Sequence, residues 1–235
     1  MMQDFLEYLY ETHGFDPKFI RQITAGKRYF AVELVNGNIG VCATLGEKYD
    51  SNMPKEIFPN IYRHRLLLNA YYNALLNYRL YYVEENMDIT DLQMNTYRHI
   101  VFVGKFDPVF EKLREQKIRF SYIDTRALDS PDNQINNKEE VLSAADLLII
   151  SATAITNGTL NNLLKNSPYS DKYILGPSSI LSPDISLWGI KGVFGVQFKP
   201  YDSRVLGVIA QDYGTHYFLH KGKKVMLRCE YTDKK

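Results

Sequence analysis

The chain of 235 residues carries 28 Lys and Arg against 27 Asp and Glu, and 45% of its residues are hydrophobic. This balance of charge excludes the strongly basic surface that nucleic acids and anionic membranes attract, so we expect neither as a partner. No apolar run approaches the ~20 residues of a membrane span. Two cysteines make no disulfide framework and the N-terminus lacks a signal-peptide pattern, so a cytoplasmic location is expected.

Residues 1–90 are predicted to form a small α+β domain. A short helix is expected at residues 5–10, where apolar side chains have helical spacing, and a second at residues 17–23. Two β-rich runs, at residues 29–35 and 39–45, flank an Asn-Gly pair, which is the strongest short signal for a hairpin. This half is therefore expected to hold a small sheet backed by helices.

A long helix is expected at residues 61–84, because apolar side chains recur there at the i, i+3, i+4 positions. Further leucines and tyrosines lie off that stripe, so more than one face of the helix is apolar. Tyrosine is enriched at interfaces, and two-fold dimers are the commonest assembly of soluble proteins. We therefore expect a homodimer that uses this helix, with burial of its second face inside one chain as the alternative.

Residues 86–98 are polar and weakly patterned, so they are predicted to link the first half to a second domain at residues 98–235. Short aliphatic strands alternate with helices in this domain, which is typical of a parallel sheet covered on both faces. We therefore predict an α/β fold with a Rossmann-like second domain that ends in a hairpin beyond Gln211. Its strands are expected at residues 100–103, 118–123, 147–150, 173–175 and 193–198.

Small, polar and glycine-rich segments follow the first four of these strands. In an open parallel sheet, ligands bind outside the carboxyl ends of the strands, which all lie along one edge. The four segments are therefore expected to converge into one ligand site. Its predicted residues are Gly104, Lys105, Phe106, Asp124, Thr153, Thr156, Asn157, Gly158, Thr159, Gly176, Pro177, Ser178 and Ser179.

Residues 151–160 hold more hydroxyl and amide groups than the helix that follows needs for its N-terminal cap. The surplus suits an anionic or hydroxylated ligand, and a simple capped turn is the alternative. Gly104 and Asp124 are 20 residues apart, which is the spacing of a ribose-binding acid in dinucleotide sites. The other two glycines of that fingerprint are missing, so a dinucleotide is not favoured.

Patterns for metal binding and catalysis are sparse. His216 and His220 would share one face, but no third ligand is spaced near them and no CxxC motif occurs, so no metal site is expected. Asp124 and Lys105 could act as an acid–base pair, which makes an enzyme acting on a polar metabolite one alternative. A structural or interaction protein without a ligand is another. The sequence identifies no cofactor.

Several short motifs resemble those of a known family, proposed to chelate heavy metals, whose Rossmann-like domain follows one similar to the N-terminal domain of enolase. The resemblance implies a bacterial or archaeal cytoplasmic protein with a cleft between its two domains. Lys105 stands where that family often has His, and Asp124 where Glu is common, which weakens any direct metal role. The motifs are Gly104-Lys105-Phe106, Thr153-x-x-Asn157-x-Thr159, Gly176-Pro177-Ser178 and, in the first half, Ala31-Val32-Glu33-Leu34 and Asn73-Ala74-Leu75.

The leading interpretation is a small-molecule-binding protein with an interdomain cleft. The hydroxyl and amide groups of the predicted site would donate hydrogen bonds, and its glycines would let the backbone approach the ligand closely. The resemblance adds a role in handling transition metals. The expected ligand is therefore a small polar or anionic metabolite or a metal chelate.

Overall fold

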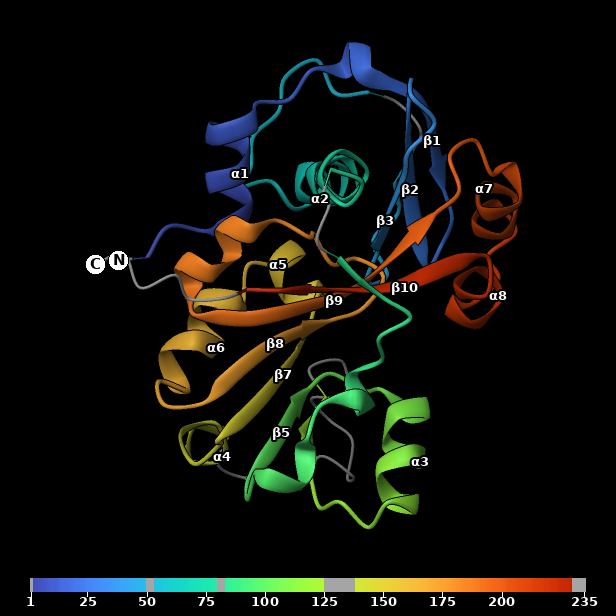
Figure 1. Ribbon diagram of the computed structural model, residues 1–235. Helices are drawn as coiled ribbons and strands as arrows, with labels where there is room; N and C mark the ends of the chain where they lie inside the picture. The colour runs from blue at the N-terminus through green and yellow to red at the C-terminus, as the bar shows by residue number, and fades with distance from the viewer. Residues whose placement is uncertain (1, 50–52, 80–82, 125–137, 230–235) are drawn as a thin grey trace.

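The computed structural model describes residues 2–49, 53–79, 83–124 and 138–229, which form two β-sheets with helices around them (Figure 1). The smaller sheet is antiparallel and consists of β1 (Ile20–Ala25), β2 (Tyr29–Leu34) and β3 (Ile39–Ala43). The larger sheet has seven strands. Their order is β4 (Val83–Glu85), β10 (Gly222–Arg228), β9 (Ile190–Phe198), β8 (Asp171–Leu175), β7 (Leu147–Ser151), β5 (Ile100–Val103) and β6 (Ser121–Ile123).

The larger sheet is parallel from β9 to β6, and β10 runs antiparallel to both of its neighbours. Its central strands β5, β7 and β8 are short and almost wholly buried, as strands covered on both faces must be. The predicted α/β fold class is therefore confirmed. The helices are α1 (Phe5–His13), α2 (Tyr62–Leu76), α3 (Asp107–Glu115), α4 (Lys138–Ser143), α5 (Thr153–Thr156), α6 (Leu160–Asn166), α7 (Ser203–Ala210) and α8 (Thr215–Leu219).

The predicted hairpin is present as β2 and β3. Gly37 adopts a φ of 84° in the turn, a conformation that favours glycine, and its backbone N–H donates to the carbonyl of Leu34. The prediction of a helix at residues 17–23 is wrong, because a single 3-10 turn (Pro17–Phe19) leads directly into β1. Ile20, Ile23 and Thr24 are β-branched residues that suit a strand, and pairing with β2 decides the structure of this segment.

The long helix ends earlier than predicted. α2 stops at Leu76, and residues 83–85 form β4, the edge strand of the larger sheet. Two cross-strand ion pairs accompany the pairing of β4 with β10: Glu84 with Arg228 at 2.8 Å, and Glu85 with Lys223. The division of the chain into two domains near residue 90 stays a prediction. β4 precedes that boundary, yet it joins a sheet whose other strands follow it.

Helix α2 is enclosed on all sides within this chain. Every residue from Arg65 to Ala74 is buried, and the helix packs between α1, α5 and the smaller sheet (Figure 1). Its apolar side chains join one core with a face of the larger sheet. The surplus apolar surface that suggested a dimer is thus accounted for inside one chain. The homodimer stays a prediction without that support.

The chain ends differently from the predicted hairpin. Residues 215–219 form α8, and β10 then enters the larger sheet between β9 and β4. Phe218 of α8 is fully buried against Tyr29 and Phe198, with ring centroids 4.7 and 6.1 Å away. This packing against the smaller sheet favours a helix over a strand for residues 217–219. None of the described helices is long and apolar enough to cross a membrane.

Candidate ligand site at the carboxyl ends of the parallel strands

The ends of β5, β6, β7 and β8 lie side by side, and we call this edge the rim. A Cβ placed on Gly104, after β5, would lie 3.0 Å from the Cβ of Ser151, which ends β7. A Cβ on Gly176, after β8, would lie 3.6 Å from the Cβ of Ala152. The backbone N–H of Gly104 donates to the carbonyl of Ile123, at the end of β6. The structure therefore brings the four predicted segments to one edge.

Two glycines at the rim have backbone conformations that side chains disfavour. Gly104 has a φ of 117° and Gly176 a φ of 139°. Both occur at the points where the chain leaves a buried strand, and both are half-buried. Their lack of a side chain leaves the backbone accessible to a small molecule at the rim.

The open part of the rim carries hydroxyl groups and one cation. The hydroxyls of Ser151 and Thr153 are hydrogen-bonded to each other at 2.8 Å, and both residues are half-buried. Lys105 is exposed, with its ammonium 3.6 Å from the carboxylate of Asp107. Phe106 packs on Phe102, with ring centroids 6.0 Å apart.

Asp124 directly follows β6 and has 9% of its surface exposed. Residues 125–137, which follow it, lie outside the described residues. The pairing of Asp124 with Lys105 as acid and base stays a prediction, and the ion pair seen for Lys105 is with Asp107.

The turn after α5 satisfies its own polar groups. The side-chain oxygen of Asn157 accepts from the backbone N–H of Thr159 at 3.1 Å and from the Thr159 hydroxyl at 2.7 Å. Gly158 lies between them with a φ of 73°, and both Gly158 and Thr159 are exposed. These contacts agree with the capped-turn alternative for Asn157 and Thr159.

Three of the four remaining predicted residues are buried behind the rim, and Pro177 is half-buried. The Ser178 hydroxyl accepts from the backbone N–H of Ala43 at 2.9 Å, and the Thr156 hydroxyl is 3.3 Å from the thiol of Cys42. The Ser179 hydroxyl donates to the carbonyl of Phe194, in β9, at 2.7 Å. Thr156, Ser178 and Ser179 are each at most 1% exposed, and the first two hold β3 against the rim.

The sequence analysis missed the residues of α2 that face the rim. Arg65, Asn69, Asn73 and Asn77 recur every four residues, which places them on one face of the helix. The Asn73 amide donates to the carbonyls of Pro177 and Ser179, at 2.9 Å each. The Asn77 amide donates to the Ser179 carbonyl at 3.0 Å. A polar residue at every fourth position of an otherwise apolar helix was the signal that could have found them.

Arg65 joins α2 to α5 and to the N-terminus. Its guanidinium donates to the carbonyls of Thr156 at 2.7 Å and Ile155 at 2.6 Å, and it pairs with the carboxylate of Asp4 at 2.9 Å. Arg65 itself is 7% exposed. A buried guanidinium needs a hydrogen-bond acceptor for most of its N–H groups, and these contacts supply them. The role of Arg65 in the structure is therefore to hold these segments together.

Asn69 is the exception on this face of α2. It is fully buried, and neither its side-chain N–H2 nor its oxygen has a hydrogen-bond partner among the described residues. Asn73, one turn later, makes two hydrogen bonds through its N–H2 group. The two asparagines therefore form a natural comparison between a bonded and an unbonded buried amide.

We expect Asn73→Leu to lower the free energy of unfolding by about 2–3 kcal/mol, because it leaves two buried carbonyls with fewer donors. Asn69→Leu should cost less than ~1 kcal/mol or stabilise the fold. It replaces two buried polar atoms that lack hydrogen-bond partners with apolar atoms, in a side chain of similar shape. Urea unfolding followed by circular dichroism measures both. Equal losses in the two variants would show that volume rather than hydrogen bonding governs this helix face.

Burial suppresses ionisation around β3 and α2. It raises the pKa of the Cys42 thiol to about 12 and that of the Tyr62 hydroxyl to about 12. Cys42 is therefore a neutral thiol at physiological pH, which makes it a poor ligand for soft metal ions. Within the described ranges, no three His, Cys, Asp or Glu side chains cluster as a metal site would require. The side chain of His216 lies outside what the structure describes.

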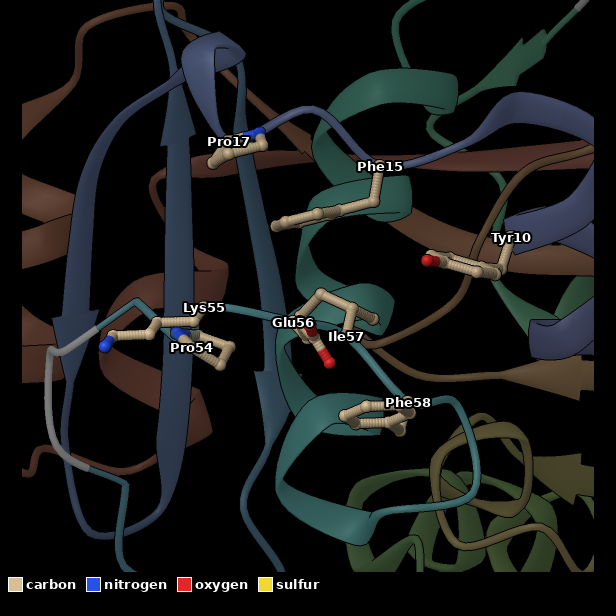
Figure 2. Close-up of a pocket in the computed structure, with 8 residues that line it drawn as sticks. All are labelled: Tyr10, Phe15, Pro17, Pro54, Lys55, Glu56, Ile57 and Phe58. Carbon is tan, nitrogen blue, oxygen red and sulfur yellow. The ribbon is translucent and has the colours of Figure 1, made fainter.

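Two hollows lie away from the rim. One, of about 380 Å³, lies between the segment that follows α1 and residues 54–58. Figure 2 shows the rings of Tyr10, Phe15 and Phe58 around Ile57, while the Lys55 ammonium points away. The other, of about 700 Å³, lies at the opposite end of the parallel strands. Neither hollow is lined by a residue of the predicted site.

Comparisons with known proteins agree with this architecture. The model of the DUF364 family, described as "Putative heavy-metal chelation", matches residues 87–228. A protein of unknown function from that family in Pyrococcus horikoshii is 21% identical with a TM-score of 0.72, over 89% of this chain and 92% of its own. One from Desulfitobacterium hafniense DCB-2 is 20% identical with a TM-score of 0.71, over 95% and 98%. No curated protein matches the chain.

Proposed function

The chain belongs to the DUF364 family, and on this premise we propose that it binds a small polar or anionic molecule at the rim, with a metal chelate as the leading candidate. The single observation that carries the proposal is the meeting of three strand ends at Gly104, Ser151 and Gly176. Two of these positions expose backbone without a side chain, and the third supplies a hydroxyl. This is the edge at which open α/β sheets bind their ligands.

The residues of the open rim fit an anionic or hydroxylated ligand. Ser151 and Thr153 offer hydroxyl groups, and the exposed Lys105 offers a positive charge. The ion pair of Lys105 with Asp107 is at the surface, where such pairs contribute less than about 1 kcal/mol. A ligand carboxylate or phosphate can therefore compete for this ammonium. Thr156, Ser178 and Ser179 would support the rim from behind rather than touch the ligand.

A chelated metal fits these residues better than a bare ion. The described rim residues offer hydroxyls, backbone groups, an ammonium and the single carboxylate of Asp124, whereas zinc and similar ions select a set of three or four thiolate, imidazole and carboxylate ligands. A chelator would supply those ligands and present its own oxygens to the protein. We therefore expect Zn²⁺ alone to bind weakly and a Zn²⁺–citrate complex to bind more tightly.

Native mass spectrometry of protein purified under mild conditions would identify a co-purified ligand, and calorimetric titration with Zn²⁺, citrate and Zn²⁺–citrate tests the chelate. Lys105→Met and Thr153→Val should each weaken binding at the rim at least ~10-fold, or about 1.4 kcal/mol. Lys165→Met is the matched control, since Lys165 is exposed on α6. Equal affinity in all three variants, or tight binding of Zn²⁺ alone, would contradict the proposal.

A further inference from the structure

The hollow of about 700 Å³ lies at the amino ends of β5 and β6, opposite the rim. The residues that matter to its chemistry are Arg98, His99, Arg114, Arg119 and Tyr122. They come from the residues before β5, the end of α3, the connection between α3 and β6, and β6 itself. Three exposed arginines therefore line one hollow large enough for a metabolite.

The arginines of this hollow have no acidic partner among the residues that the structure describes. No described carboxylate lies within 4.0 Å of the guanidinium of Arg98, Arg114 or Arg119. Arg65 and Arg204, in contrast, are paired with Asp4 and Asp202. The chain has a net charge of only +1, so this is a local concentration of positive charge.

Contacts within the chain hold the Arg114 side chain and the backbone at Arg98 in place. The guanidinium of Arg114 lies over the ring of Phe120, 5.8 Å from its centroid. The backbone N–H groups of Arg98 and His99 donate to the two carboxylate oxygens of Asp146, at 2.9 and 2.8 Å. Each oxygen of the Asp146 carboxylate thus accepts from one of these two amides. Segments held in this way lose less entropy when they bind a ligand.

We propose that this hollow binds a small molecule that carries two or more phosphate groups. The planar guanidinium fork matches phosphate oxygens with two parallel hydrogen bonds, so three such groups can hold more than one phosphate. Among the described residues the rim offers one ammonium, that of Lys105, whereas a ligand with two phosphate groups is better matched by several cations. This site is independent of the function proposed for the rim.

Isothermal titration of the full chain with inorganic pyrophosphate, at low and at physiological salt, tests the proposal. We expect one pyrophosphate per chain, bound more tightly than orthophosphate. Arg98→Ala combined with Arg119→Ala should weaken binding at least ~10-fold, and the corresponding double Lys variant should still weaken it several-fold, because it keeps charge but loses the fork. Arg79→Ala removes an exposed arginine elsewhere and should leave binding unchanged.

Three results would overturn the proposal: no binding at millimolar pyrophosphate, an equal loss in Arg79→Ala, or full binding in the double Lys variant. Either of the last two results would show that pyrophosphate is attracted by positive charge in general and not by a specific site. Thermal unfolding of each variant confirms that it is folded, and the exposed positions make a loss of structure unexpected. Lys105→Met at the rim should leave pyrophosphate binding intact, so failure at one site is distinguishable from failure at the other.

Discussion

Arg65→Met is expected to lower the free energy of unfolding by about 3–5 kcal/mol, the range seen when one partner of a buried charged network is removed. The guanidinium donates to carbonyls of α5 and to the carbonyl of Pro59, and it pairs with Asp4. Asp4 also caps α1 by accepting from the backbone N–H of Leu6. The substitution would leave these buried acceptors without their donor and loosen the contact between α1, α2 and α5.

Urea unfolding followed by circular dichroism measures this loss, and Arg63→Met is the matched control. Arg63 is exposed two residues earlier on the same helix, and among the described residues its side chain donates to the carbonyl of Lys48 over a long distance of 3.4 Å. The control should stay within ~0.5 kcal/mol of the parent. Arg65→Lys should fall between the two, because it keeps the charge but cannot reach all the acceptors. A loss below ~1 kcal/mol in Arg65→Met would contradict the assigned role.

Gly40→Ala is expected to cost at least ~3 kcal/mol or to prevent folding, because its added methyl has no space. A Cβ at this position of β3 would lie 2.0 Å from the carbonyl oxygen of Ala70 and 2.3 Å from the backbone nitrogen of Ala74. Both atoms belong to the backbone of α2, so relief would require moving the whole helix. The absence of a side chain at Gly40 therefore allows α2 to lie directly on the smaller sheet.

Gly207→Ala is the control for this substitution. Gly207 lies within α7, and a Cβ there meets no atom within 4 Å. Alanine should stabilise this helix by about 0.5–1 kcal/mol, through its higher helix propensity. Soluble yield, followed by urea unfolding where protein is obtained, separates the two variants. A Gly40→Ala protein as stable as the parent would show that α2 can shift away from β3 at little cost.

Local signals in the sequence were sufficient for the elements that depend on local structure. The Asn-Gly turn located the β2–β3 hairpin, and short aliphatic runs located the parallel strands. The signals failed where the partner lies far away in the chain. β1 depends on pairing with β2, and β4 depends on β10, more than 130 residues later. Periodicity alone cannot show such pairing, so these segments were assigned to helices.

The same limit applies to the candidate site. The strand order of a parallel sheet was enough to predict which segments share the rim. Which of those residues face solvent depends on where α2 and β3 pack, and the sequence gives no measure of that. Thr156 and Ser178 are predicted ligand donors because polar residues at strand ends resemble a site. The structure places their hydroxyls against Cys42 and the backbone of β3, which no local pattern in the sequence indicates.

The position of β10 has a consequence for biosynthesis. β4 pairs with β10 alone, and β10 comes from the last residues of the described chain. While the chain is being made from its N-terminus, residues 83–85 have no neighbouring strand until residues 222–228 leave the ribosome. The smaller sheet and α2 can assemble earlier, but the larger sheet is completed only after residues 222–228 have emerged. Until then the growing protein must keep the unpaired strand at residues 83–85 from aggregation.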